Sequence, residues 1–236
     1  MNGEIKQLGE IDGLNSMLKD MNTDKCHAVI CPPSTLLISA ARLKENSKIS
    51  FGGQNCHAEQ SGAHTGDISA EMLKDAGAQY VIVGHSERRA DCAESDEIVQ
   101  TKVKAAFRAG ITPIICIGES ENERKQGRAL KVVLEQLDKT IPTDIKDIIV
   151  AYEPVWAIGT GLVPSINDIN EMHDAIRVAL VKRFGVNGEK TPILYGGSMK
   201  PNNAKEILEL NNVNGGLVGG ASLKASDFIQ IIEACQ

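Results

Sequence analysis

Glu153 stands where an apolar run of the sequence ends, and a carboxylate in that place can act as a base. The run "IIVAY" (148–152) precedes it and Pro154 follows it. Removing a carboxylate from water is costly unless another group compensates for it. For an isolated glutamate, a buried ion pair with an arginine is the simpler explanation. Pro154 favours a functional role, because proline keeps the preceding residue extended and gives the carboxylate a defined direction.

His85 ends a second apolar run, within "VGHSERR" (83–89), and imidazole can donate or accept a proton. A purely structural interpretation makes Ser86 the N-cap of a helix, with Glu87 in its first turn. The stretch is not a G-x-S-x-G nucleophile elbow, because no glycine follows Ser86 at the required place. A helix that begins here would favour the neutral imidazole, which can donate a hydrogen bond to a substrate.

The segment "VWAIGTG" (155–161) has the composition of a hinged lid. It combines a bulky anchor, Trp156, with a small tip at Gly159 and Gly161. Lids of this kind exclude water, which strengthens the electrostatic interactions beneath them. We therefore expect the segment to cover the site that contains Glu153.

Two further glycine-rich segments suit the binding of a phosphate group. They are "YGGSMKP" (195–201) and "GGLVGGA" (215–221). Neither is a Walker A loop, but both place glycines between an apolar run and a helix, where amide N–H groups can point at an anion. The candidate contacts are Ser198, Gly219 and Gly220. The glycines of one loop could simply permit a tight turn, whereas two loops together with Gly159 favour phosphate.

The elements that must position these residues alternate along the chain. Seven short runs rich in β-branched residues read as strands buried on both faces, namely 27–31, 49–55, 80–85, 112–118, 148–154, 192–198 and 215–221. Segments with helical spacing separate them, which predicts a parallel α/β architecture. No linker interrupts the pattern, so residues 1–236 are interpreted as one domain. The polar residues fall at the carboxyl ends of several strands, which favours a closed barrel over an open doubly wound sheet.

Three helical predictions are specific enough to test. The first recognisable element is a helix over about 11–21, so the strand that would open an eight-stranded barrel is missing from the chain. The segment 95–110 is predicted to bury one apolar face and to end at Gly110, and that face consists of Ile98, Val99, Val103, Ala106 and Phe107. The segment 167–185 is predicted to end at Gly185.

Composition excludes several classes of protein. The net charge is −6 and no basic stripe occurs, which argues against a nucleic-acid partner. No apolar run is long enough for a membrane span, and no signal segment opens the chain. The six scattered cysteines predict reduced thiols in a cytosolic protein. The remaining histidines, at 27, 57, 64 and 173, share no ligand spacing, so no metal site is predicted.

The motifs "GHSERR", "AYEPVWAIGTG", "YGGS" and "LVGGASL", in this order, resemble the triosephosphate isomerase family, and "SGAHTGDISAEML" and "IICIGE" extend the likeness through nearly the whole chain. The resemblance implies an eight-stranded (β/α)8 TIM barrel that interconverts dihydroxyacetone phosphate and glyceraldehyde 3-phosphate without a cofactor. Glu153 would be the base and His85 the neutral electrophile, roles known from this family. Gly159, Ser198, Gly219 and Gly220 would hold the phosphate.

The resemblance also implies partners and a setting. The loop "CHAEQSGAHTG" (56–66) resembles the subunit-crossing loop of the family, so that Thr65 would approach the partner's active site in a homodimer. Glu87 and Asn2 occupy supporting positions. Family members act in glycolysis and gluconeogenesis and feed the pentose phosphate pathway, which implies a cytoplasmic protein with a small phosphorylated triose as substrate and neither nucleic acid nor membrane as partner.

The chain departs from the family pattern at two places. The second hinge of the lid reads "LVPS" (162–165), where the family commonly has a lysine and small residues, and Pro164 is expected to stiffen it. The family's first strand ends in N-x-K-M-N-G, and this chain begins at "MNG", so the matching lysine would precede Met1. The expected consequences are two unpaired strand edges, lower stability and reduced turnover.

Three alternatives remain open at this point. A catalytically impaired barrel could keep phosphate binding and lose isomerisation, because the lysine is absent. Another phosphate-binding barrel isomerase would share the glycine loops, but not the combination of His85 with Glu153. A purely structural role has no positive feature in the sequence.

Overall fold

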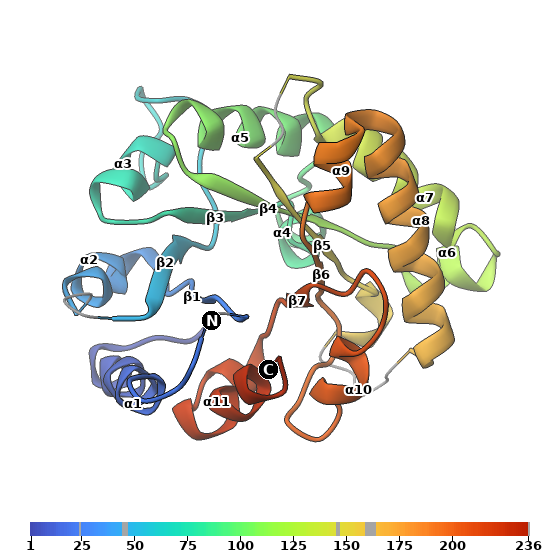
Figure 1. Cartoon of the computed structure of the whole chain (residues 1–236). Helices are drawn as coiled ribbons and strands as arrows, with labels where there is room; N and C mark the ends of the chain where they lie inside the picture. Colours follow the sequence, from blue (N-terminus) through green and yellow to red (C-terminus); the bar gives the residue numbers. More distant parts are fainter. Residues whose placement is uncertain (24, 44–46, 145–146, 159–163, 236) are drawn as a thin grey trace.

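The computed structural model describes residues 1–23, 25–43, 47–144, 147–158 and 164–235. Its strands curl into a ring surrounded by helices (Figure 1). Within the described residues one parallel sheet runs in sequence order, with the strands β1 Ala28–Ile30, β2 Ile49–Gly53, β3 Tyr80–Val83, β4 Thr112–Ile117, β5 Ile149–Tyr152, β6 Ile193–Tyr195 and β7 Gly215–Gly216. Each predicted strand is therefore present, and each is shorter than its apolar run.

The helices form the outer layer of the ring (Figure 1). The α-helices are α1 Leu8–Leu18, α2 Ser34–Arg42, α3 Ala70–Asp75, α4 Ser86–Asp91, α5 Asp96–Arg108, α6 Glu121–Lys125, α7 Ala129–Thr140, α8 Ile166–Phe184, α9 Val186–Lys190, α10 Ala204–Leu208 and α11 Ala225–Glu233. Three short 3₁₀ segments accompany them in the described chain, η1 Ile5–Gln7, η2 Val155–Ala157 and η3 Gly220–Ser222. A parallel sheet with helices outside it is the arrangement that the alternating pattern predicts.

Aliphatic side chains fill the space on both faces of the sheet, as the low aromatic content requires. A small cluster around Ile114, Cys116 and Ala151 comes from neighbouring strands β4 and β5. A larger cluster packs the strands against the surrounding helices. Because each strand is covered on both faces, its sequence is apolar nearly throughout rather than alternating.

Two helical predictions need correction and one is confirmed. The first α-helix begins at Leu8 and ends at Leu18, three residues earlier at each end than the predicted 11–21. In α5, Val99, Val103 and Ala106 are buried as predicted, but Ile98 and Phe107 are 42% and 50% exposed. The buried face is rotated toward Lys102 and Ala105, because the buried ammonium of Lys102 bonds to Glu94 and occupies part of it. Helix α8 ends at Phe184 with Gly185 as its C-cap, as predicted, and the φ of +58° at Gly185 suits glycine.

The ring of strands has a seam between β1 and β7. Within the described chain each of these two strands pairs with a single neighbour, β2 and β6 respectively, as expected for unpaired edges. The helices nevertheless meet across the seam, since α1 packs against α11. The Glu10 carboxylate accepts the Ala225 N–H at 2.8 Å, which joins the first α-helix to the N-terminal end of the last. The outer layer is thus continuous where the inner one is interrupted.

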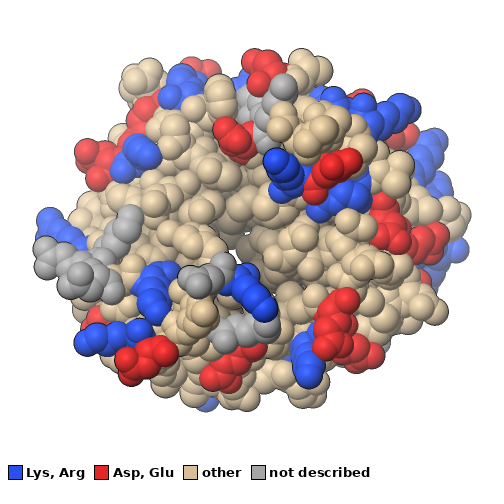
Figure 2. Space-filling model, viewed as in Figure 1, with Lys and Arg blue, Asp and Glu red and all other residues tan. Residues whose placement is uncertain are grey.

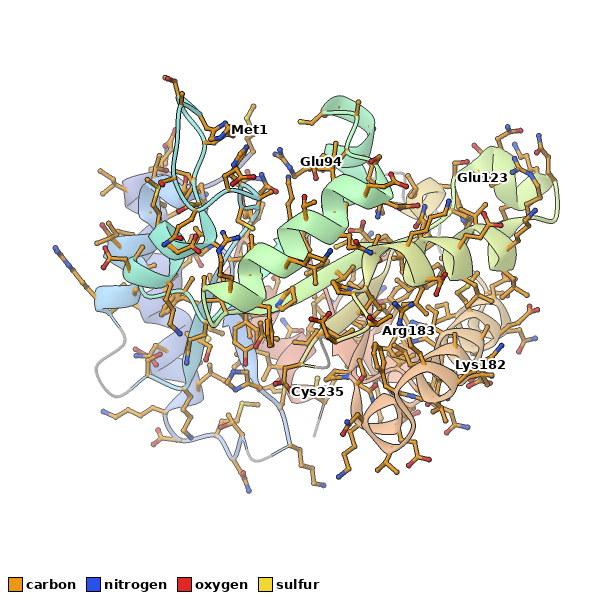
Figure 3. All side chains as sticks on the ribbon, turned by 90° about the horizontal axis from the view of Figure 1, so that it is seen from above. Met1, Glu94, Glu123, Lys182, Arg183 and Cys235 are labelled. Atoms are coloured by element: carbon orange, nitrogen blue, oxygen red, sulfur yellow. The ribbon has the colours of Figure 1, made fainter. Side chains whose placement is uncertain are left out.

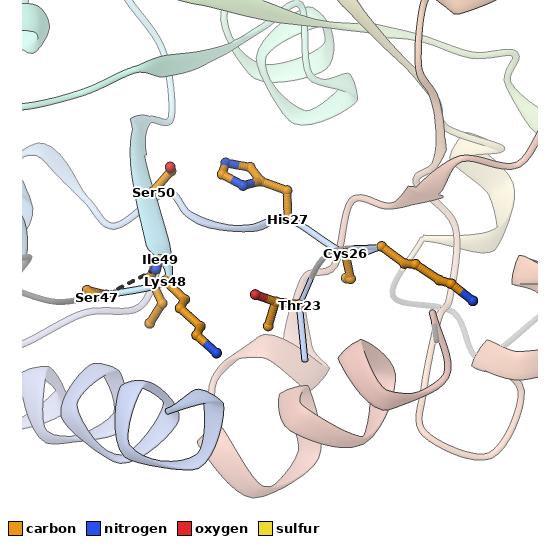
Figure 4. A pocket seen from close by; sticks show the side chains of 8 residues that line it. Thr23, Cys26, His27, Ser47, Lys48, Ile49 and Ser50 are labelled. Atoms are coloured by element: carbon orange, nitrogen blue, oxygen red, sulfur yellow. Dashed lines mark hydrogen bonds between the residues drawn. The ribbon is translucent and has the colours of Figure 1, made fainter. Parts of the chain in front are cut away.

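The amino ends of the strands carry a polar hollow. Thr23, His27, Lys48 and Ser50 line it, at the starts of β1 and β2 (Figure 4). Figure 2 views the same end of the molecule and shows a hollow near the centre, with acidic and basic side chains interspersed around it. The residues singled out for chemistry follow the opposite, carboxyl ends of the strands, so this hollow is not their site.

The six cysteines all lie within the described residues, and none of them forms a disulfide there. Burial raises the pKa of Cys31 and of Cys56 to about 12, and it also raises the pKa of Cys116. Raised thiol pKa values keep these side chains protonated and chemically inert near neutral pH. They act as small core residues.

Arg177 of α8 ties that helix to the segments before β6 and β7, and every acceptor it reaches among the described residues is uncharged. Its guanidinium donates to Asn212 Oδ1 at 3.0 Å and to Asn214 Oδ1 at 2.9 Å, and also to the carbonyl oxygens of Gly188 and Thr191. Burial lowers the pKa of Arg177. A carboxylate in place of Asn212 or Asn214 would therefore lie next to the positive charge of Arg177, which has no anionic partner among the described residues.

Asn214→Asp is expected to raise the free energy of unfolding by about 0.5–1 kcal/mol. Asn214 Oδ1 also accepts the Ile193 N–H at 3.0 Å, so a carboxylate there would receive two hydrogen bonds from donors already in place. The matched variant Asn212→Asp should give little gain, because the Asn212 amide donates to Asp174 at 2.7 Å and the new carboxylate would face that carboxylate. Urea unfolding at pH 7 measures the free energy of unfolding of both variants. Equal changes in the two variants would contradict the explanation that the new carboxylate stabilises the protein by pairing with Arg177.

Candidate active site

The candidate catalytic residues lie at one end of the barrel. His85 follows β3 and Glu153 follows β5, both at the carboxyl ends of their strands. In the side view of Figure 3, Met1 and Glu94 mark this end and Cys235 lies toward the other. A parallel barrel brings all its carboxyl strand ends to one rim, which is why residues 68 positions apart can meet.

His85 and Glu153 are in direct contact. His85 Nε2 lies 2.9 Å from Glu153 Oε1, and the other carboxylate oxygen accepts the Ser86 N–H at 2.9 Å. The Glu153 side chain is 2% exposed and that of His85 is 26% exposed. A nearly buried carboxylate thus faces an imidazole that solvent still reaches. The alternative of a buried ion pair between Glu153 and an arginine is wrong for this structure.

His85 itself is the N-cap of α4, so the interpretation of Ser86 as the N-cap is wrong by one residue. His85 Nδ1 accepts the Glu87 N–H at 3.3 Å. A ring nitrogen that accepts a backbone N–H carries no proton, so in the neutral ring the proton is on Nε2, the atom that faces Glu153. The helix start therefore selects the tautomer that can donate toward the site.

The protonation equilibrium of His85 depends on two opposing effects. Burial lowers the pKa of His85, but the hydrogen bond and charge of Glu153, with a smaller contribution from Glu87, outweigh burial and raise the pKa above its ordinary value. The direction is opposite to the one expected from the helix start alone. The reason is that Glu153 touches the ring in this structure.

Glu153→Gln should lower the pKa of His85, because glutamine keeps the shape of the side chain and removes its charge. The pKa is measured by NMR titration of the imidazole signals, with His85→Asn identifying the resonance. An unchanged or higher pKa of His85 in the glutamine variant would show that the charge of Glu153 does not raise the pKa of His85.

Two glycines allow neighbouring strand ends to approach Glu153 closely. A Cβ atom on Gly118, after β4, would lie 1.7 Å from the Glu153 carbonyl oxygen. A Cβ atom on Gly196, after β6, would lie 2.9 Å from Glu153 Cγ. The Gly196 N–H also donates to the Tyr152 carbonyl at 2.7 Å. The backbones on both sides of β5 therefore fix the position of Glu153.

Glu119, which the sequence interpretation did not single out, anchors the segment after Glu153. Its side chain is fully buried, and Oε1 accepts hydrogen bonds from Tyr152 Oη at 3.2 Å, Trp156 Nε1 at 2.9 Å and Arg124 Nη1 at 3.2 Å. Arg124 also lies over the Trp156 ring at 5.0 Å from its centroid. Glu119 follows the apolar run of β4 as Glu153 follows that of β5. A search for carboxylates that directly follow an apolar strand would therefore have identified Glu119 in "IICIGE" as well.

The candidate phosphate contacts occupy the loops after β6 and β7. Ser198 is half-buried and its carbonyl accepts the side chain of Asn203 at 3.0 Å. Gly219 and Gly220 are exposed and lead into η3, and the described chain offers their N–H groups no acceptor. Gly159, the lid contact, lies outside the described residues. Both loops follow the carboxyl ends of strands that run parallel to β5, so both lie at the same end of the barrel as Glu153.

The three remaining predicted positions are exposed. Glu87 lies in the first turn of α4, with its carboxylate 3.9 Å from His85 Nδ1. Asn2 precedes η1 at the start of the chain. Thr65 lies on the loop between β2 and α3, which projects beyond the barrel end that carries the Met1 label in Figure 3.

Comparison with known proteins shows the family to which the chain belongs. A family model described as triosephosphate isomerase matches residues 1–235. A triosephosphate isomerase of Afipia carboxidovorans is 55% identical over 237 residues, covering 100% of this chain and 94% of the relative, and one of Bradyrhizobium diazoefficiens is 50% identical with the same coverage. The crystal structure of triosephosphate isomerase from Bartonella henselae matches with a TM-score of 0.92 and 46% identity, over 99% of this chain and 94% of that one. The seven described strands are thus part of a (β/α)8 barrel, and the chain belongs to the triosephosphate isomerase family.

Proposed function

We propose that Glu153 and His85 together move a proton between adjacent carbons of a triose phosphate, interconverting dihydroxyacetone phosphate and D-glyceraldehyde 3-phosphate. Glu153 takes a proton from the carbon next to the carbonyl, and the electron pair moves to the carbonyl oxygen. A proton also passes from the hydroxyl oxygen of the first carbon to the former carbonyl oxygen, and the same carboxyl group then returns a proton to the neighbouring carbon. The observation that supports this assignment best is the 2.9 Å contact between Glu153 Oε1 and His85 Nε2.

His85 supplies the donor for the oxygen on which charge develops. Its proton is on Nε2, because the Glu87 N–H occupies Nδ1. Substrate that enters between the two side chains must open their contact, and this removes the charge that raises the pKa of His85. The neutral ring then serves as a hydrogen-bond donor matched to an enediolate.

The phosphate is placed by the loops after β6 and β7. Ser198 offers a hydroxyl, and Gly219 and Gly220 offer exposed N–H groups. Gly159 of the lid is the remaining proposed contact. Amide N–H groups bind a dianion by hydrogen bonding and dipole alignment, so no lysine is required from this loop pair.

We also propose the wider setting that the family likeness implies. The chain would form one domain over residues 1–236, consistent with the single described sheet, and would act as a cytoplasmic homodimer in which Thr65 approaches the partner's site and Glu87 and Asn2 support the catalytic pair. No cofactor, nucleic acid or membrane takes part in this proposal. In the described chain no helix is long and apolar enough to cross a bilayer.

The test is isomerisation in deuterated water. Purified protein is incubated with dihydroxyacetone phosphate, and proton NMR follows the formation of glyceraldehyde 3-phosphate and the entry of deuterium at the reacting carbon. Product with deuterium that disappears in Glu153→Gln is the expected result. Unchanged substrate together with binding of 2-phosphoglycolate, an analogue of the enediolate, would instead identify a phosphate-binding barrel without catalysis.

A further inference from the structure

Two cysteines from distant parts of the sequence meet where the outer layer of the barrel closes. A hydrogen bond joins the thiols of Cys26 and Cys235. Cys26 precedes β1 and Cys235 follows α11, so the contact lies beside the seam, where α1 packs against α11. Figure 3 shows Cys235 toward the barrel end opposite the one that Met1 and Glu94 mark. The pair is therefore remote from the candidate active site and from the loop proposed for the subunit contact.

Backbone hydrogen bonds hold both cysteines in place. The Cys26 N–H donates to the Thr23 carbonyl at 3.1 Å, which closes a turn directly before β1. The Cys235 N–H donates to the Ile232 carbonyl at 3.1 Å, so that Cys235 continues the last turn of α11. The Cys235 thiol also reaches the Ile231 carbonyl, at 3.6 Å. The two thiols thus project from ordered segments that the fold places side by side.

The two thiols differ in reactivity, and Cys26 is the more reactive one. The hydrogen bond from Cys235 stabilises the Cys26 thiolate, which lowers the pKa of Cys26 in spite of its partial burial. The same bond, together with burial, raises the pKa of Cys235. Because a thiolate attacks an oxidant and a thiol does not, Cys26 is the first of the pair to react.

A small oxidant can reach this pair from solvent. Both cysteines are half-buried rather than enclosed in the core. Cys26 also lines the polar hollow at the amino ends of the strands, which measures about 460 Å³ (Figure 4). Cysteines that sense oxidants combine thiolate character, access to solvent and a neighbouring thiol that resolves the oxidised sulfur. Cys26 has all three.

We propose that Cys26 and Cys235 form a reversible disulfide within one chain when the protein meets a hydroperoxide. The Cys26 thiolate attacks a peroxide oxygen, so that an S–O bond forms, the O–O bond breaks and the leaving oxygen takes a proton from water. The Cys235 sulfur then attacks the sulfenic acid on Cys26. The S–S bond forms, the S–O bond breaks, and the hydroxyl group leaves with the Cys235 proton as water. Two thiols are oxidised and one hydroperoxide is reduced to an alcohol or water.

Spacing along the sequence could not have indicated this pair. The six cysteines are scattered and form no C-x-x-C motif, so each is interpreted from the sequence as a separate reduced thiol. Closure of the ring of helices brings α11 beside the segment before β1 and so brings the two thiols together. The reduced state remains the starting point of the proposal, and an oxidant is needed to change it.

The experiment is oxidation of the reduced protein with hydrogen peroxide at pH 7, followed by alkylation of the remaining thiols and peptide mass spectrometry without reduction. The expected product is a peptide pair that joins Cys26 to Cys235, and dithiothreitol should separate it. Absence of this product, or Cys26 joined to another cysteine, would overturn the proposal. A product of twice the chain mass on a non-reducing gel would also overturn it, since the proposed bond lies within one chain.

Three serine variants test the order of the steps. Cys235→Ser should stop at the sulfenic acid of Cys26, which dimedone traps, because no second thiol is present to displace it. Cys26→Ser should slow the oxidation of Cys235 at least tenfold. Cys92→Ser is the matched control, since it removes an exposed thiol, and it should form the Cys26–Cys235 bond as the unaltered protein does. Dimedone on Cys235 rather than Cys26 would contradict the assignment of the first step.

A second measurement follows the consequence for stability. The bond would connect α11 to the segment before β1 across the seam and would restrict the unfolded chain, so oxidation should raise the melting temperature by about 5–15 °C. Dithiothreitol should reverse the rise, and Cys26→Ser should show none. An equal rise in Cys26→Ser would mean that the proposed bond is not its cause. Because no readout depends on isomerase activity, failure of the proposed catalytic function would leave both tests intact.

Discussion

Replacing Glu153 by glutamine is expected to reduce kcat for isomerisation about 10³-fold, with little change in KM. Glutamine keeps the length and shape of the side chain and can still accept the Ser86 N–H, which lies 2.9 Å from the carboxylate. It cannot remove a proton from carbon. The loss therefore falls on the chemical step rather than on binding. A coupled assay with glyceraldehyde 3-phosphate measures both constants.

Two further variants test whether the loss of activity comes from the missing carboxylate of Glu153. Glu135→Gln removes a carboxylate from the exposed face of α7 and should leave kcat unchanged. Glu153→Asp keeps the charge but withdraws it by one methylene group, and should give an intermediate loss, because proton transfer depends on close positioning. Glutamine and aspartate variants with full activity would exclude Glu153 as the base.

Gly118→Ala is expected to destabilise the folded protein by at least about 3 kcal/mol, or to prevent folding. The added methyl group would lie 1.7 Å from the carbonyl oxygen and 2.7 Å from the carbonyl carbon of Glu153. Both neighbours are backbone atoms, so no side chain can rotate away. Strands β4 and β5 would have to separate at the point where Glu153 N–H donates to the Ile117 carbonyl at 2.8 Å. Urea unfolding followed by circular dichroism gives the change.

Gly9→Ala is the matched control for this experiment. Gly9 lies near the start of α1, and a Cβ atom there would meet nothing within 4 Å. Alanine in a helix interior is more stable than glycine by about 0.5–1 kcal/mol, so the control should gain stability. Similar losses in both variants would mean that the close approach at Gly118 is not the cause.

Much of the fold was predictable because parallel strands buried on both faces leave an unusual sequence signature. Each predicted strand contains a strand of the structure, from β1 at Ala28–Ile30 to β7 at Gly215–Gly216. The position of polar residues at strand ends also indicated which end of the barrel carries the site. His85 and Glu153 could be paired in advance, since every strand in such a barrel ends at the same rim.

The parts that were missed depend on contacts between distant side chains. The buried face of α5 could not be read from apolar spacing, because a charged residue, Lys102, is buried there against Glu94. Glu119 gains its role from Trp156, Tyr152 and Arg124, which come from three other segments. Periodicity carries no information about any of these contacts.

The glycine contacts around Glu153 bear on how such an enzyme can change through evolution. Gly118 and Gly196 let main-chain atoms, rather than interlocking side chains, locate the carboxylate. Aliphatic substitutions in the hydrophobic core on either face of the sheet, such as exchanges at Ile114 or Val150, can then accumulate while Glu153 keeps its place. When backbone atoms position a functional side chain, the surrounding hydrophobic residues can be exchanged during evolution without moving it. Only the glycines that allow the close backbone approach cannot be replaced.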